Sequence, residues 1–329
     1  MAQLLRVAPD SVLISPRGEQ SQLSIISTES GRGRSLQRRD VVEVVDPRRD
    51  SRFGRHTYTR TDTCGHVFGA PTGWSFVPNG GSRYSDSIPL VRLNIRTGRI
   101  DTILRFAIGD VPSGTPPIVD NEIRQRLDLG PYRAENDWTV KGDGTVILVD
   151  ARHYQILERS ADGKTMLWPN LPAFPTRAIS DREWSAYLDS SRVQQQRLLA
   201  PLSVMPGRSR GSSRVKITLL DPPRPNSRPP VATEGRRRIM LSPTDLWVPL
   251  GDCQGDQRTC WDVLSLSTRT RRGTIQLNAG ETLLGLSRHF VYVGRADEDD
   301  LIAIWRHAYP HSFAGKAVRP TSGPYVKCG

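Results

Sequence analysis

Two short patterns in the sequence match arrangements that carry out chemistry in other proteins. Gly207-Arg-Ser-Arg-Gly211 matches G-x-S-x-G, in which a strand before the serine and a helix after it expose a nucleophilic hydroxyl. Here the pattern lies in an Arg- and Ser-rich stretch of an otherwise strand-rich chain, so we expect no nucleophile. His307 and His311 have the i, i+4 spacing of a zinc pair, but Pro310 between them prevents the helix that such a pair requires.

The acidic run Asp297-Glu-Asp-Asp300 could supply the carboxylate oxygens that calcium prefers. It lacks the Asp-x-Asp-x-Asp-Gly spacing of a calcium loop, and a solvated hairpin turn explains it more simply. These motifs therefore predict no catalytic residue, no bound metal and no cofactor.

Cys253 and Cys260 are the informative pair among the four cysteines. Two strand-like runs flank the polar, glycine-containing loop between them, so the two side chains can face each other across the neck of a hairpin. Facing positions on antiparallel strands lie about 4.5–5.5 Å apart, within the range of a disulfide. We therefore predict a Cys253–Cys260 disulfide, which favours an oxidising compartment. The alternative is two unpaired thiols that are close in sequence.

The chain has 329 residues and a net charge of +12, which raises the question of nucleic-acid binding. Only five of its 46 basic residues are lysine, and its arginines are spread along the chain. Their local clusters fall in predicted turns or connections without interleaved aromatic residues, so we do not expect nucleic acid as a partner. No run of about 18 apolar residues is present, so no membrane-spanning segment is predicted.

A strand–turn–strand unit recurs along the chain, and its clearest copy covers residues 136–164. Three β-runs are separated by polar turns, and the Asp-Gly pairs at Asp143 and Asp162 are strong hairpin signals. Apolar and polar residues alternate within the runs, which is typical of strands with two distinct faces. Looser copies lead from residues 11–15 to 22–27, from 73–77 to 89–104, from 244–248 to 261–267 and from 288–293 to 300–306.

Such sheets cannot bury both of their faces alone, so five or more copies must stack, either around an axis or side by side. The variable spacing disfavours a solenoid, whose coils are nearly uniform. We therefore predict an all-β fold, a β-propeller of about six blades of which one can be incomplete, as a single domain over residues 1–329.

Three segments depart from the repeat. Ser180-Asp-Arg-Glu183 is a capping box followed by apolar residues at helical spacing, which predicts one inserted helix at residues 181–199. Its simplest role is to cover one face of the propeller. Residues 203–235 form a Pro-, Arg- and Ser-rich connection, exposed and partly disordered, around a strand at 215–220. Residues 309–329 are either a tail or a strand that closes the ring with the N-terminus.

Residues 86–102, Asp137-Trp-Thr-Val with Asp143-Gly, and residues 290–301 resemble blades of bacterial six-bladed propellers of the NHL/TolB-like type. The resemblance covers about residues 10–306 and rests on turns and strand cores, not on active-site residues. Most members of that group are exported and functionally uncharacterised, which implies a periplasmic or extracellular location. The start of the chain shows no signal peptide, so we expect a cytoplasmic protein or part of an exported precursor that lacks one blade.

We predict a non-enzymatic binding or scaffold propeller, a monomer that holds a protein, peptide or glycan ligand with the loops of one face. Aromatic and arginine side chains dominate the energetics of such interfaces. The candidate ligand-binding residues lie near strand starts and are Trp74, Asn136, Asp137, Trp138, Arg152 and Trp247. For the tryptophans, packing between blades is the open alternative.

A metal-dependent hydrolase or lactonase is the alternative function. Propeller enzymes of this kind hold a metal on the central axis with acidic and amide side chains from different blades. Asn136, Asp137, Asp245 and Asp262 are chemically suitable. Three or more of their oxygens converging on the axis would favour the hydrolase, whereas an apolar or arginine-lined axis would argue against it.

Overall fold

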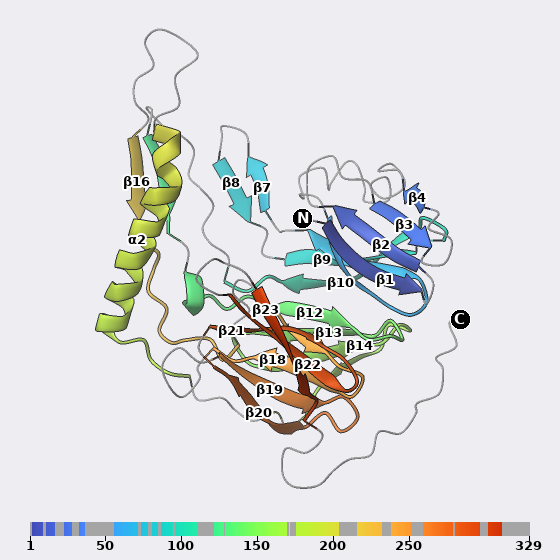
Figure 1. Cartoon of the computed structure of the whole chain (residues 1–329). Helices are drawn as coiled ribbons and strands as arrows, with labels where there is room; N and C mark the ends of the chain where they lie inside the picture. Colours follow the sequence, from blue (N-terminus) through green and yellow to red (C-terminus); the bar gives the residue numbers. More distant parts are fainter. Residues whose placement is uncertain are drawn as a thin grey trace.

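Antiparallel sheets whose strand order mostly follows the chain make up most of the molecule (Figure 1). The computed structural model describes residues 2–8, 11–16, 23–27, 33–36, 56–71, 74–77, 81–84, 87–94, 96–110, 122–127, 129–169, 171, 176–203, 216–231, 238–251, 259–278, 280–296 and 302–310. Within these ranges, four meander-like sheets have four strands and a fifth has three.

The five sheets are numbered here in chain order. Sheet 1 contains β1 (Ala2–Ala8), β2 (Ser11–Pro16), β3 (Leu23–Ser27) and β4 (Gly33–Leu36). Sheet 2 contains β5 (His56–Thr61), β6 (His66–Pro71), β9 (Ser87–Asn94) and β10 (Ile100–Ala107). Sheet 3 contains β12 (Asp137–Val140), β13 (Val146–Asp150), β14 (Gln155–Arg159) and β15 (Thr165–Leu167). Sheet 4 contains β17 (Met240–Leu241), β18 (Asp245–Pro249), β19 (Thr259–Ser265) and β20 (Arg271–Leu277). Sheet 5 contains β21 (Glu281–Leu286), β22 (Phe290–Ala296) and β23 (Ile302–Ala308).

The first strands of successive sheets lie next to one another. β1 contacts β5, β5 contacts β12, and β17 contacts β21. Between sheets 3 and 4, Asp137 Oδ2 accepts a hydrogen bond of 2.9 Å from the N–H of Ile239, one residue before β17. The sheets therefore radiate from a common set of inner strands, which is the arrangement of a β-propeller. The predicted all-β propeller class is confirmed, but the count of about six blades is not supported, because the described residues form five such sheets.

Sheet 3 shows why the sheets depend on one another. Along β13, Val146 packs with Phe68 of sheet 2, whereas the next residue, Ile147, packs in a cluster with Leu246 of sheet 4. On the other face of sheet 4, Trp247 packs in a cluster with side chains of sheet 5. Because side chains alternate along a strand, each inner sheet buries both faces only between two neighbours.

One α-helix among the described residues, α2 (Asp181–Ser203), lies at the outer side of the ring (Figure 1). Ser180 Oγ accepts the N–H of Glu183 at 3.2 Å, the N-cap contact that the capping box predicts. The helix ends four residues beyond the predicted range of 181–199. It is tied to the strand before Asp221 by an ion pair between Arg192 Nη2 and Asp221 Oδ2 of 2.6 Å.

The remaining elements are insertions between the sheets. β7 (Trp74–Val77) and β8 (Gly81–Tyr84) form a separate hairpin between β6 and β9. The prediction that residues 73–77 and 89–104 share a blade is therefore wrong, because β9 pairs with β6 and β10. β11 (Glu122–Arg126) pairs in parallel with β16 (Lys216–Leu220), and η1 (Gly130–Tyr132) is a 3-10 turn that leads towards β12.

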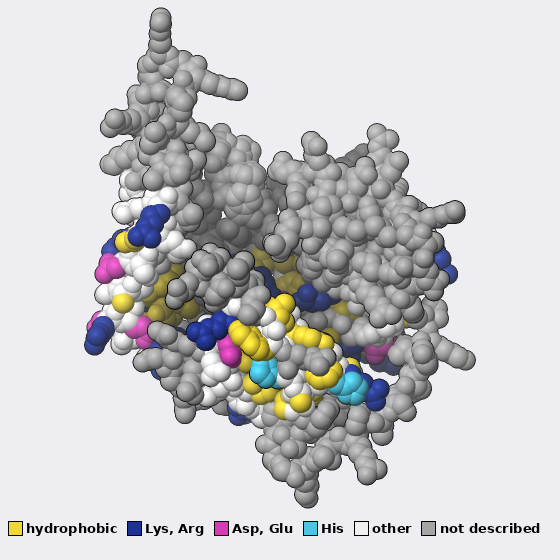
Figure 2. All heavy atoms as spheres, in the orientation of Figure 1, with side chains coloured by type: hydrophobic (Ala, Val, Ile, Leu, Met, Phe, Trp, Pro, Cys, Tyr) yellow, Lys and Arg dark blue, Asp and Glu magenta, His cyan; other side chains and the backbone are white. Residues whose placement is uncertain are grey.

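The outer strand of sheet 5 carries exposed apolar side chains. Ile304 is 64% exposed and Trp305 is 44% exposed, and Figure 2 shows hydrophobic side chains gathered over this sheet. Among the described residues, no helix is both long enough and apolar enough to cross a bilayer.

Candidate functional site

Three predicted binding residues, Asn136, Asp137 and Arg152, lie at the same end of sheet 3. Asn136 precedes β12, Asp137 begins it, and Arg152 lies in the turn between β13 and β14. Because antiparallel neighbours reverse direction at each turn, the start of β12 and the β13–β14 turn share one end of the sheet.

Asn136 ties three segments together at this end. Its Nδ2 donates to the carbonyl of Ala107 at 3.0 Å, and its Oδ1 accepts the N–H of Ala151 at 2.9 Å. The side chain thereby joins the end of β10, the start of β12 and the turn that carries Arg152. An amide suits this position because it supplies a donor and an acceptor at once.

Asp137 lies between arginines rather than other carboxylates. It is buried, and it accepts N–H groups from Trp138 and Ile239, both at 2.9 Å. Burial raises its pKa above the ordinary value, while the positive charges of Arg238 and Arg60 oppose that shift. Arg60 on β5 and Arg238, two residues before β17, thus place positive charge at this carboxylate, which disfavours a metal cation there.

Arg152 pairs with Asp110, which lies just beyond β10. Its Nη2 donates to Asp110 Oδ1, and the other carboxylate oxygen accepts the N–H of Ala134 at 3.1 Å. The Arg152 side chain is 55% exposed, whereas that of Asp110 is 21% exposed. Asp110 is therefore fixed to the backbone, and Arg152 reaches it from a solvent-exposed turn.

A pocket of about 20 Å³ opens beside this pair. That volume is close to the roughly 10–15 Å³ that one water molecule requires, and far below the roughly 300–1,000 Å³ of a small-molecule site. The pocket can admit one small polar group, not a whole substrate. Its lining consists of Asp110, Tyr132, Ala134, Arg152, Thr176, Ser227, Arg228, Pro229 and Pro230.

Arg228 forms the second positive wall of the pocket. Its Nε donates to Glu183 Oε1 at 2.7 Å, and its guanidinium carbon lies 5.3 Å from the centre of the Tyr132 ring. Glu183 also accepts from the Tyr132 hydroxyl at 3.1 Å and from Arg177 Nη2 at 3.1 Å. The N-terminal turn of α2 therefore holds Arg228 in place through a single carboxylate.

The chain approaches itself closely behind the pocket. The N–H of Gly251 donates to the carbonyl of Pro230 at 2.8 Å, and a Cβ at Gly251 would lie only 2.0 Å from the carbonyl oxygen of Pro229. Only glycine at position 251 therefore leaves room for residues 229–230 to line the pocket at this distance. Pro229 and Val231 are buried, so the predicted connection at 203–235 is not exposed throughout.

The predicted tryptophans do not line this pocket. Trp138 packs in the core between sheets 2 and 3, and Trp247 is fully buried between sheets 4 and 5. A side chain without accessible surface cannot contact a ligand unless the blades rearrange. The side chain of Trp74, in β7, lies outside the described residues.

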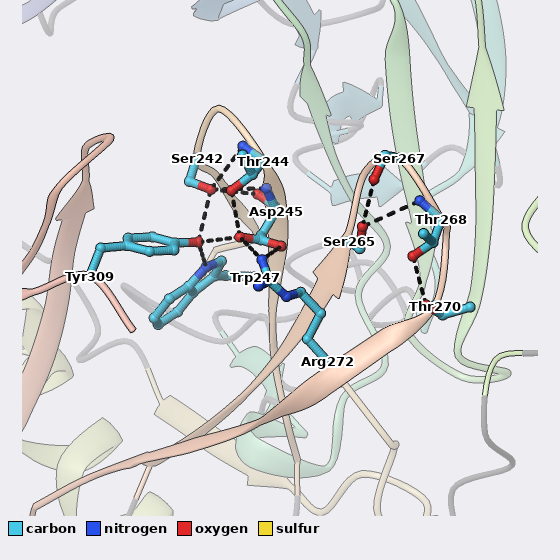
Figure 3. Close-up of polar contacts among 10 residues, drawn as sticks. All are labelled: Ser242, Thr244, Asp245, Trp247, Ser265, Ser267, Thr268, Thr270, Arg272 and Tyr309. Carbon is cyan, nitrogen blue, oxygen red and sulfur yellow. Dashed lines mark hydrogen bonds and ion pairs between the residues drawn. The ribbon is translucent and has the colours of Figure 1, made fainter. Parts of the chain in front are cut away.

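Asp245 and Asp262 are each surrounded by donors of their own. Asp245 is buried and accepts from Arg272 Nη1 at 2.9 and 3.0 Å and from the Tyr309 hydroxyl at 2.7 Å (Figure 3). Asp262 is buried and accepts from the Tyr154 hydroxyl at 2.7 Å and Arg271 Nε at 3.0 Å. Both networks join neighbouring elements of the ring and leave these carboxylates occupied.

No group of three or more His, Cys, Asp or Glu side chains in the described part is arranged to hold a metal. Asn136, Asp137, Asp245 and Asp262 are therefore not brought together as a ligand set there. Residues 207–211 and 297–300 lie outside the described residues.

The disulfide prediction involves one described residue. Cys260 is buried in β19, and neither Cys260 nor Cys64, the other described cysteine, is a free thiol. Cys253 lies outside the described residues, so the Cys253–Cys260 pairing stays a prediction.

A wider hollow of about 590 Å³ lies along the exposed face of α2. Its described lining comes from this one helix and consists of Asp189, Ser190, Val193, Gln194 and Arg197. Within the described ranges no second element contributes a polar group to it. The Arg152 pocket, where five separate segments meet, is therefore the stronger candidate site.

No protein-family model matches the chain, and no curated protein matches it. Its similarities are to solved β-propeller structures. An uncharacterized protein, lmo1340, from Listeria monocytogenes EGD-e gives a TM-score of 0.31 at 7% identity, covering 89% of this chain and 74% of that one. A member of the DUF4221 family from Bacteroides vulgatus gives 0.35 at 10%, covering 91% and 76%. TolB from Acinetobacter baumannii gives 0.27 at 11%, covering 82% and 53%. At these scores the assignment of the fold rests on the sheet order, and no activity is transferred.

Sequence reasoning missed Asp110 and Arg228, which complete the pocket. Asp110 follows a strand without any motif, and Arg228 belongs to a Pro-rich stretch that was expected to be exposed. The one available signal was Glu183, because a carboxylate in a capping box can also bind a basic side chain from elsewhere in the chain.

Proposed function

We propose that this chain is a non-enzymatic binding propeller that holds its ligand at the Arg152 pocket. The observation that carries the proposal is a pocket of about 20 Å³ whose lining comes from five segments, three of which contribute a charged side chain. Such a site can receive one polar group of a large partner, while the rest of the partner lies across the surrounding surface. A protein, a peptide or a glycan could present that group.

The surroundings of the pocket suit recognition because two of its three charged side chains are already positioned. Asp110 is held by a backbone N–H, and Arg228 is held by Glu183. Fixed groups lose little conformational freedom when a ligand binds, which favours affinity at small contact area.

Selection from a phage-displayed random peptide library against the immobilised protein tests this function, with a glycan array as a second arm. We expect selected ligands to bind Arg152→Gln about tenfold more weakly, equivalent to about 1.4 kcal/mol. Arg105→Gln, an exposed arginine on β10 with the same change of charge, is the matched control and should bind normally.

Two outcomes would overturn the proposal. One is that the selected ligands bind Arg152→Gln as tightly as the parent protein. The other is metal-dependent turnover of ester or lactone substrates that Asp137→Asn abolishes while that variant remains folded.

A further inference from the structure

In the ion pair between Arg152 and Asp110, a carboxylate of a ligand can take the place of the Asp110 carboxylate. We infer that the pocket takes a carboxylate of an acidic peptide, which replaces Asp110 on the Arg152 guanidinium; this rests on the binding function proposed above. Arg152 is more than half exposed, and exposed ion pairs contribute little to stability because water and salt screen them. Replacing one carboxylate by another keeps this guanidinium in an ion pair, and Asp110 retains its hydrogen bond from the Ala134 N–H.

Asp110 keeps its position when Arg152 leaves it. Ala134 donates its N–H to Asp110 Oδ2 at 3.1 Å, and Arg133 Nε donates to the Asp110 carbonyl at 3.0 Å. The mobile member of the pair is the long Arg152 side chain on its turn. A ligand thus redirects one side chain and leaves the pocket wall intact.

Arg228 supplies the fixed positive charge of the pocket. Its side chain is 24% exposed, and it is held by Glu183 and by the face of Tyr132. A carboxylate that enters between the two guanidinium groups can accept N–H groups from both through charge-assisted hydrogen bonds, which are stronger than neutral ones.

The size and charge of the lining match one carboxylate. The ionic side chains that line the pocket are Arg152, Arg228 and Asp110, two positive and one negative. Arg228 is already paired with Glu183, so Arg152, once separated from Asp110, is the positive charge that a single carboxylate balances. Because one water molecule requires roughly 10–15 Å³, a volume of about 20 Å³ admits a carboxylate oxygen but not a sugar ring.

A peptide is favoured over an acidic glycan because the described surface lacks an exposed ring face at this place. Tyr132 is only 3% exposed, and its ring is covered by Trp184 and Tyr187 at centroid distances of 5.5 and 5.1 Å. The polar rim can instead hydrogen-bond to a peptide backbone.

Fluorescence anisotropy with hexaglutamate that carries a rhodamine label tests the inference on the full chain. Hexaglutamine is the neutral control, and labelled hexagalacturonate is the glycan arm. We expect hexaglutamate to bind, with affinity about tenfold lower in Arg152→Gln. We expect affinity several-fold higher in Asp110→Asn, because the internal competitor for Arg152 loses its charge.

Asp162→Asn is the matched control for Asp110→Asn. It raises the net charge equally, at an exposed turn at the other end of sheet 3. Equal gains in affinity from both variants would show general attraction by positive charge and would overturn the inference. Arg105→Gln controls Arg152→Gln in the same way, and circular dichroism of each variant confirms that it is folded.

The remaining outcomes separate this inference from the proposed function. If hexagalacturonate bound and hexaglutamate did not, the ligand would be a glycan rather than a peptide, and the inference would be overturned. If the peptides selected from the library lack acidic residues but still depend on Arg152 for binding, the inference of a carboxylate ligand is overturned. The proposed binding function would still stand. Ligands that are all indifferent to Arg152 would overturn both.

Discussion

The Tyr309 hydroxyl donates a hydrogen bond of 2.7 Å to the buried carboxylate of Asp245, which joins the segment after β23 to the first residue of β18 (Figure 3). The same hydroxyl accepts from Trp247 Nε1 at 2.9 Å. Burial, together with the nearby Asp245, raises the pKa of Tyr309 from 10.0 to about 12. Sheets 4 and 5 are therefore joined through a phenol that must stay protonated.

Stability should fall in strong alkali because the folded protein holds this proton more tightly than the unfolded chain. The contribution of Tyr309 is complete below pH 10 and is lost as the pH rises towards 12, a change of about 3 kcal/mol. Urea unfolding across this range measures it. Tyr309→Phe should cost about 1–3 kcal/mol at neutral pH and show a shallower alkaline loss. An identical alkaline slope in both proteins would contradict the role of this hydroxyl.

Two buried tryptophans should respond differently to the loss of the indole N–H. Trp247 Nε1 donates to Tyr309, whereas Trp261 Nε1 has no hydrogen-bond partner among the described residues. Trp247→Phe should cost about 1–2 kcal/mol more than Trp261→Phe, because a buried donor without a partner already carries its desolvation cost. Chemical denaturation of both variants measures the difference. Equal losses would mean that only ring volume matters at the two positions.

Asn136 should determine the position of the turn that carries Arg152. Asn136→Ala removes both of its contacts and should destabilise the protein by about 1–3 kcal/mol. Hydrogen exchange should rise at the amide of Ala151, which loses its acceptor. Asn278→Ala, which removes an exposed contact to Glu281, is the control and should cost less than about 0.5 kcal/mol. Unchanged exchange at Ala151 would contradict this account of the turn.

Docking of α2 should weaken in acid. Burial alone would raise the pKa of Glu183, but hydrogen bonds from Arg228 and Tyr132 hold it below the ordinary value of 4.5. The contribution of Glu183 is therefore present above that value and is lost as the pH falls below it. Hydrogen exchange of α2 at about pH 6 and about pH 3.5 measures the loss, and Glu183→Gln should abolish this dependence. Glu281→Gln, on β21, is the control and should leave the pH dependence of exchange in α2 unchanged. If both variants altered that dependence equally, it would reflect a general effect of acid.

Local sequence signals predicted the meander of sheet 3 well. Gly144 and Gly163, each after an aspartate, have φ of +82° and +89°, which glycine adopts without strain, so the turns fall where the Asp-Gly pairs stand. The signals did not identify partners that are distant in sequence. β7 alternates like a blade strand, yet within the described ranges its one partner is β8, and β11 pairs with β16, which is remote in the chain.

The residues around the Arg152 pocket could be anticipated only in part, for the same reason. Arg152 and Asn136 stand beside strands that the pattern locates, so their common end of the sheet could be expected. Arg228 reaches the pocket because Gly251 lets the 229–230 segment approach β18 closely, and this depends on packing rather than on periodicity. The tryptophans were candidates for the ligand face. For Trp138 and Trp247, burying the large apolar ring between sheets stabilises the protein more than exposing it at that face.

Hydrogen-exchange mass spectrometry of the full chain, with and without saturating hexaglutamate, tests the central claim most directly, because it reports which end of the ring binds. The account predicts slower exchange at residues 150–154 and 226–231, around Arg152 and Arg228, and loss of that protection in Arg152→Gln. Protection confined to the opposite turns of sheet 3, at residues 141–145 and 160–164, would contradict it.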